Sequence, residues 1–170
     1  PASCGQEAWE AIYHIASLLT IAREKHIPII YSTGNRRLAG SGTPNDPTKF
    51  LRGGELSITQ HGDDIVGEIA PQEGDLIIYK AKPSIFFGTS LVSLLNTRHV
   101  DTLLVCGGTT SGCVRASVTD ASSYNYKVSV IQECTFDRGQ ASHKINLFDM
   151  NAKYADVVSI TEVKKYLKAL

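Results

Sequence analysis

The sequence lacks an excess of either charge, because 17 Lys and Arg residues balance 17 Asp and Glu residues over 170 positions. This balance excludes the strong basic field by which many proteins hold nucleic acid or anionic membranes. The chain also lacks an apolar run of membrane-spanning length and any segment resembling a signal peptide. No internal repeat or linker divides it. We therefore expect one cytoplasmic domain over residues 1–170, with no nucleic-acid or membrane partner.

The cysteines lack the spacing of a metal site. They stand at positions 4, 106, 113 and 134, and even the shortest gap, between Cys106 and Cys113, is not a known zinc pattern. Free thiols in a reducing compartment are expected instead. The sequence thus predicts neither a metal nor another cofactor.

Strand-like segments alternate with helix-like segments along the chain. The strand-like segments are nearly all apolar, which is typical of a parallel sheet covered by helices on both faces. The predicted strands are 27–33, 75–80, 102–106, 127–131 and 156–160, and the predicted helices are 7–25, 90–96, 113–125, 143–152 and 161–170. This order predicts an α/β fold, whose active site would lie at the carboxyl ends of the strands.

A polar stretch with little periodicity separates the first two predicted strands. Residues 34–74 contain several Gly and Pro residues and predict a long surface loop region. Binding residues are often found in such loops, so this region is expected to shape a pocket.

The most informative segment runs from Leu103 to Arg115. An apolar strand ends there in two glycines, and Cys113 follows at the start of an apolar pattern with helical spacing. A helix N-terminus favours a thiolate and offers backbone N–H groups to an oxyanion, which indicates a nucleophile. The alternative is a buried structural thiol, which fits Cys106 inside the strand better than Cys113 among Thr, Ser and Gly. Spacing alone leaves both interpretations of Cys113 open.

Two basic residues end strands at the same expected edge. Lys80 closes the second predicted strand, beside two phenylalanines, and could favour a neighbouring thiolate if it is partly desolvated. Arg138 follows the fourth predicted strand and could clamp a carboxylate with two hydrogen bonds. Taken singly, each residue is more often a solvated lysine or an arginine paired with a neighbour such as Asp137.

Three segments together resemble the isochorismatase-like cysteine hydrolase superfamily, and most closely its N-carbamoylsarcosine amidohydrolase and maleamate amidase branch. These segments are Thr-Thr-Ser-Gly-Cys-Val-Arg-Ala at 109–116, the stretch 80–89 with its Ser-x-Phe-Phe-Gly-Thr ending, and 146–157. The resemblance extends over essentially the whole chain. It implies a three-layer α-β-α fold with a parallel sheet, and a homodimer or homotetramer.

The resemblance also implies an amidase mechanism. Cys113 would attack a carboxamide or carbamoyl carbon, expel ammonia and form a thioester that water hydrolyses. Lys80 matches the family's catalytic lysine, whereas Lys82 is two residues out of register. The oxyanion hole would be formed by the backbone N–H groups of Cys113 and Thr109, next to a cis peptide bond expected at Gly108–Thr109.

The substrate class follows from the same resemblance. Arg138, 25 residues after Cys113, matches the family position that holds a substrate carboxylate. We expect Phe86 and Thr110 to contact the substrate as well. The predicted reaction is therefore hydrolysis of a small carboxylate-bearing amide or N-carbamoyl compound, although the sequence does not name the compound.

One family feature is missing. The third catalytic residue of the family is an aspartate at the end of a central strand that precedes the first helix, and here Pro1 to Gln6 lead directly into that helix. None of Asp63, Asp64, Asp75 and Asp137 replaces it by position. The resemblance therefore implies an N-terminally incomplete domain, from a truncated or cleaved chain, with two exposed sheet edges.

Three alternatives bear on function. Metal-dependent nicotinamidases use an Asp-x-His pair, which this sequence lacks, and its histidines (His14, His26, His61, His99 and His143) are scattered singly. We interpret these as structural or solvated, with His143 as the one that could face the pocket. A non-catalytic binding or oligomerisation module remains a second hypothesis, and a Cys-His peptidase a third.

Overall fold

The protein is described by a computed structural model, which covers residues 4–34 and 64–170. The helices are α1 (Gly5–Glu24), α3 (Leu91–Thr97), α4 (Arg115–Ser123), α5 (Gln140–Lys153) and α6 (Ile160–Ala169), with short turns η1 (Gly67–Ile69) and η2 (Thr110–Val114). The strands are β1 (Ile30–Gly34), β2 (Leu76–Lys80), β3 (Thr102–Gly108), β4 (Lys127–Phe136) and β5 (Asp156–Val158). Within these described ranges, no helix is long and apolar enough to cross a membrane.

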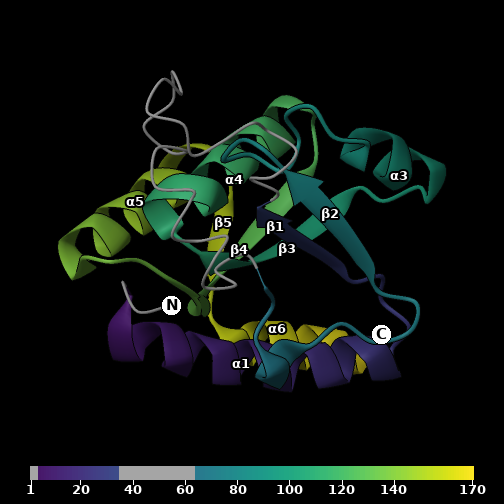
Figure 1. The fold of residues 1–170 in the computed structure, drawn as a ribbon, viewed down its shortest axis with the longest axis horizontal. Coiled ribbons are helices and arrows are strands. Elements are labelled where there is room, and N and C mark those ends of the chain that lie inside the picture. Colours follow the sequence, from purple (N-terminus) through teal and green to yellow (C-terminus); the bar gives the residue numbers. More distant parts are fainter. Residues whose placement is uncertain (1–3, 35–63) are drawn as a thin grey trace.

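The strands form the middle layer of a three-layer α/β arrangement. All strand pairs are parallel, as predicted from the apolar strands. Helices α1 and α6 cover one face of the strands, and α3, α4 and α5 cover the other (Figure 1). The α/β fold with helices on both faces is therefore confirmed.

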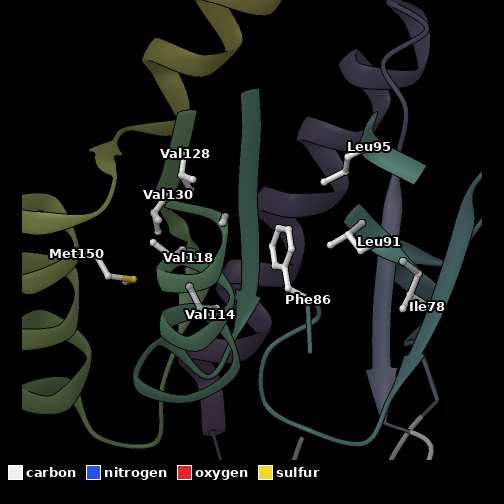
Figure 2. Packing of buried hydrophobic residues seen from close by; sticks show 10 residues of the cluster. Ile78, Phe86, Leu91, Leu95, Val114, Val118, Val128, Val130 and Met150 are labelled. Atoms are coloured by element: carbon white, nitrogen blue, oxygen red, sulfur yellow. The ribbon is translucent and has the colours of Figure 1, made fainter. Parts of the chain in front are cut away.

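Two apolar clusters hold the layers together. The smaller one joins α1, β4 and α6 through Ile15, Leu18, Ile131, Cys134, Ile160, Val163 and Leu167. The larger one lies on the opposite face, and its members include Ile78, Phe86, Leu91, Leu95, Val114, Val118, Val128, Val130 and Met150. Figure 2 shows the Phe86 ring between the valines of α4 and β4 on one side and Leu91 and Ile78 on the other.

The strands divide into two sheets. β1 pairs with β2, and β3 pairs with β4, which pairs with β5. A cavity of about 620 Å³ lies between the two sheets and is lined along its length by residues of β1 and β3. Residues of α1 line it on one face, and residues of α3 and α4 on the other. The described residues place no strand between β1 and β3.

Element boundaries differ from the prediction mainly at β1, β4 and α5. β1 begins at Ile30, three residues after the predicted start. β4 continues to Phe136 instead of ending at residue 131, because its pairing with β3 resumes after an irregularity between Val105 and Gly107. α5 begins at Gln140, three residues before the predicted start. β5 ends at Val158 because Ser159 caps α6 in a capping box with Glu162. Of the predicted loop region, residues 35–63 lie outside the described residues, and 64–74 contain η1.

Candidate active site

The end of β3 explains why two glycines stand before the cysteine-bearing turn. Gly107 has a φ of +108°, which side chains other than glycine rarely adopt. A Cβ atom on Gly108 would lie 2.4 Å from the ring of Phe136, at the end of β4. Both positions therefore require glycine, so that the chain can leave the sheet tightly against the neighbouring strand.

Cys113 lies in η2, a single π-helical turn that continues into α4. The expected cis peptide bond is present at Gly108–Thr109. The carbonyl of Thr109 accepts hydrogen bonds from the N–H groups of Gly112 and Val114, at 3.0 and 3.2 Å. This places Cys113 at the start of a helix, directly past the carboxyl end of β3, as the sequence pattern predicts.

Lys80 contacts the cysteine. It is the last residue of β2 and is 7% exposed, and its Nζ lies 3.3 Å from Sγ of Cys113. The ammonium also donates to the carbonyl of Lys82 at 3.2 Å. The expected Lys80–Cys113 contact is therefore confirmed, and Lys82 contacts Lys80 through its backbone carbonyl. A buried ammonium beside a thiol electrostatically favours the thiolate.

Asp137 contacts the cysteine-bearing turn. The sequence did not reveal this contact. Its side chain is buried, and Oδ2 accepts a hydrogen bond from the N–H of Ser111 at 2.7 Å. Burial by itself raises the pKa of Asp137, but hydrogen bonds from Ser111 and the backbone N–H of Arg138, with the Arg138 charge, outweigh it. The pKa of Asp137 is lowered overall, so this carboxylate is ionised at neutral pH.

Thr110 and His143 form a second contact between the turn and its surroundings. The Thr110 hydroxyl donates to the carbonyl of Phe136 at 3.0 Å and lies 2.8 Å from Nδ1 of His143. Because the hydroxyl has only one proton, Nδ1 of His143 is assigned as the donor to Thr110. Burial lowers the pKa of His143, Asp137 raises it, and Lys144 lowers it further, with a net lowering that favours the neutral ring.

The three predicted substrate contacts lie in different environments. Arg138 is exposed beside the turn, and its backbone N–H donates a hydrogen bond to Oδ1 of Asp137 at 2.8 Å. Phe86 is buried, stacks on Tyr124 with ring centroids 5.6 Å apart, and lines the cavity between the sheets. Thr110 is fully buried, with its hydroxyl engaged as described. Their contacts with a substrate remain predictions, and for Thr110 such a contact would involve the backbone, because its side chain is fully buried.

The site thus pairs a lysine with a cysteine on the turn that opens a helix, at the carboxyl edge of parallel strands. The family model for the isochorismatase domain matches residues 3–162. This chain belongs to the isochorismatase family.

Individual relatives agree with this membership. Maleamate amidohydrolase of Pseudomonas putida is 42% identical over 60% of this chain and 48% of its own length. N-carbamoylsarcosine amidase of an Arthrobacter species is 35% identical over 100% of this chain and 66% of its own length. The chain thus spans about half to two thirds of these curated relatives. A solved isochorismatase family protein from Desulfovibrio vulgaris has a TM-score of 0.82, with 27% identity over 97% of this chain and 88% of its own.

The other candidate carboxylates lie in different parts of this family member. Asp75 precedes β2 and pairs with Arg23 at 2.7 Å. Asp64 is exposed and borders the cavity between the sheets, and Asp63 lies outside the described residues. Among the residues that the structure covers, no three His, Cys, Asp or Glu side chains gather in a metal-binding group.

The remaining cysteines of the sheet behave as core thiols. Cys134 is fully buried in β4, and Cys106 of β3 packs against the same apolar cluster. A hydrogen bond with Cys134 and burial raise the pKa of Cys106 well above its ordinary value. Cys106 is therefore a protonated thiol at neutral pH, as the core interpretation of the sequence predicted.

Proposed function

We propose that this chain is the catalytic domain of a cysteine amidohydrolase. Its substrate is a small carboxylate-bearing amide or N-carbamoyl compound, and its products include ammonia. The observation that carries the proposal is the 3.3 Å contact between the buried Lys80 ammonium and the Cys113 thiol. A cysteine in contact with a lysine can serve as the nucleophile that attacks an amide carbonyl carbon.

The chemistry follows from the reactivity of the thiolate. Sγ of Cys113 adds to the carbonyl carbon, and the resulting oxyanion lies next to the backbone at the start of η2 and α4. Backbone N–H groups there, including those of Cys113 and Thr109, can stabilise its charge. The C–N bond then breaks, the nitrogen gains a proton and leaves as ammonia, and water hydrolyses the thioester to restore the thiol.

The substrate class rests on Arg138 and on the relatives. The exposed guanidinium stands one residue after the buried Asp137, whose carboxylate bonds to the cysteine-bearing turn. A guanidinium at that point can hold a carboxylate in two hydrogen bonds and so orient the amide. Relatives named maleamate amidohydrolase and N-carbamoylsarcosine amidase act on compounds with both groups.

The test is ammonia release from a panel of N-carbamoyl amino acids and dicarboxylic monoamides, with nicotinamide as the neutral amide. We expect turnover of one or more acidic compounds and little turnover of nicotinamide. The Cys113→Ser variant, checked for folding by circular dichroism, should release no ammonia. Turnover that persists in this variant contradicts the cysteine mechanism. If the wild-type protein releases no ammonia from any acidic compound, the non-catalytic binding module becomes the better hypothesis.

A further inference from the structure

The end of β4 supplies two side-chain contacts to the turn that carries Cys113. The Asp137 carboxylate accepts the N–H of Ser111 at 2.7 Å, and the Thr110 hydroxyl donates to the carbonyl of Phe136 at 3.0 Å. We propose that Asp137 and Thr110 are positioning residues. They hold the cysteine-bearing turn in the position that places Sγ of Cys113 in contact with the Lys80 ammonium. This inference rests on the proposed function of Cys113 as the nucleophile.

The need for such contacts follows from where the two partners come from. Cys113 lies on η2, beyond β3, whereas Lys80 ends β2 in the other sheet. Lys80 and Cys113 are 33 positions apart in the sequence, so the 3.3 Å separation depends on how firmly the end of β2 and the cysteine-bearing turn are each held. A displacement of about 1 Å at a reacting atom can lower a rate by about 100-fold.

The burial of both side chains supports a positioning role. Thr110 is 0% exposed and Asp137 is 4% exposed, so neither side chain presents much surface to a ligand. Each side chain also has a second partner: Oδ1 of Asp137 accepts the Arg138 N–H at 2.8 Å, and the Thr110 hydroxyl contacts Nδ1 of His143 at 2.8 Å. Hydrogen bonds that involve an ionised carboxylate are among the stronger ones in proteins.

The sign of the charge separates positioning from electrostatics. A negative charge near a thiol disfavours its ionisation, so the Asp137 charge by itself works against a thiolate at Cys113. If Asp137 acted only through its charge, the neutral Asp137→Asn variant would have a more reactive cysteine. If it holds the turn, the variant would have a less reactive one, because the amide keeps only one of the two oxygens that accept the Ser111 and Arg138 N–H groups.

The experiment measures the alkylation rate of each cysteine by iodoacetamide, using mass spectrometry of the purified protein at pH 7 and pH 10. This reagent is neutral, so its reaction does not depend on carboxylate binding by Arg138. In Asp137→Asn we expect alkylation of Cys113 at pH 7 to be slower by about tenfold. At about pH 10, where thiols ionise without assistance, the variant and the wild type should converge. The fully buried Cys134 reports on folding, because it should stay unreactive in every folded variant.

The matched control is Glu133→Gln. Glu133 lies on the same strand, and its Oε2 also accepts a backbone N–H, that of Ile160 at 2.9 Å, but at the start of α6. Its alkylation profile should equal that of the wild type. An equal slowing of Cys113 in both variants would show a general loosening of β4 and would overturn the specific role of Asp137.

Thr110→Val tests the second contact with almost no change in volume. We expect slower Cys113 alkylation at pH 7, by about threefold, because the hydrogen bonds of the hydroxyl with the Phe136 carbonyl and with Nδ1 of His143 are both lost. Unchanged or faster alkylation in either folded variant overturns the positioning role of that residue, and if Asp137→Asn exposes Cys134, the Thr110→Val result decides. Alkylation reports on the thiol without any substrate, so this outcome is independent of the ammonia-release assay that tests the proposed function.

Discussion

The two sheets of the molecule contribute differently to the site. The β3–β4–β5 sheet carries Cys113 on a turn fixed by buried side chains, whereas the β1–β2 pair contributes Lys80 from the end of one strand. The two meet through helix α1, through the larger apolar cluster, and across the cavity between β1 and β3. The site therefore joins the carboxyl ends of β2 and β3, and side chains packed between the two regions contribute to its geometry.

Removal of the nucleophile should have the largest effect. Cys113→Ser replaces a thiolate by a hydroxyl with a much weaker tendency to ionise, and we expect kcat to fall by at least about 10⁴-fold. Circular dichroism and the unfolding midpoint should be close to those of the wild type, because the two side chains are similar in size. Competing alkylation gives a second measurement, in which Cys113 should react before Cys4, Cys106 and Cys134. Faster labelling of any of these three would contradict the assignment.

Removal of the Lys80 ammonium tests whether its contact with Cys113 contributes to activity. Lys80→Met keeps an unbranched apolar stem and deletes the ammonium that lies 3.3 Å from Sγ. We expect kcat/KM to fall by about 10²- to 10³-fold, together with slower alkylation of Cys113 at pH 7. Lys82→Met is the matched control, because the contact of Lys82 with Lys80 is through its backbone carbonyl. Equal losses in the two variants would remove the special role of Lys80.

The carboxylate hypothesis is tested by Arg138. Arg138→Ala should lower kcat/KM for an acidic substrate by about 100-fold, equal to about 3 kcal/mol of transition-state binding. Arg138→Lys should recover part of this loss, because an ammonium keeps the charge but not the paired geometry. The neutral amide analogue of the same substrate serves as the control. A loss that is the same for both substrates would indicate a structural arginine.

A smaller effect, on stability, is expected from Ser117, whose hydroxyl links the segment after β2 to the cysteine-bearing turn. The Ser117 hydroxyl on α4 accepts the Ile85 N–H at 3.1 Å and donates to the Cys113 carbonyl at 2.7 Å. Ser117→Ala leaves the Ile85 N–H unsatisfied, so the free energy of unfolding should fall by about 1–2 kcal/mol in urea titrations.

Ser123→Ala is the control for Ser117→Ala, because the exposed Ser123 hydroxyl bonds only within α4, to the Thr119 carbonyl at 2.8 Å. The control should cost less than about 0.5 kcal/mol. Equal costs for the two variants would show that Ser117 contributes no more to stability than an ordinary helical serine.

The smallest effect concerns pH. Because burial lowers the pKa of His143, the unfolded chain binds a proton more readily than the folded protein below about pH 6.5. Stability from the neutral ring is therefore present above that pH, and it is lost as the pH falls through the lower, folded-state pKa. His143→Asn, which keeps a donor for Thr110, should weaken the decrease of Tm between pH 7.5 and pH 5.

His99→Asn is the control for the pH effect. His99 is exposed and has a φ of +53°, a conformation that asparagine tolerates. Its Tm should keep the pH dependence of the wild type. If His143→Asn keeps it as well, His143 does not contribute to acid sensitivity.

Local pattern was sufficient for most of the fold. The apolar strands predicted parallel pairing, and the helical spacing after Cys113 predicted α4, because both depend on short-range periodicity. The end of β4 was missed, since its pairing resumes only beyond an irregularity that depends on β3. The resemblance located Lys80, Cys113 and the Gly108–Thr109 bond, because each lies in or next to a short sequence motif that can be recognised on its own.

By itself, the sequence determined the order of strands and helices, the place of Cys113 after a glycine pair, and the family to which its motifs point. Only the tertiary structure decided that Asp137 and His143 contact the cysteine-bearing turn. The physical reason is distance along the chain. Periodicity and turn chemistry act over a few residues, whereas the contact of Ser111 with Asp137 joins residues 26 positions apart. Such a contact forms only when β4 has packed beside β3, and no local pattern encodes that packing.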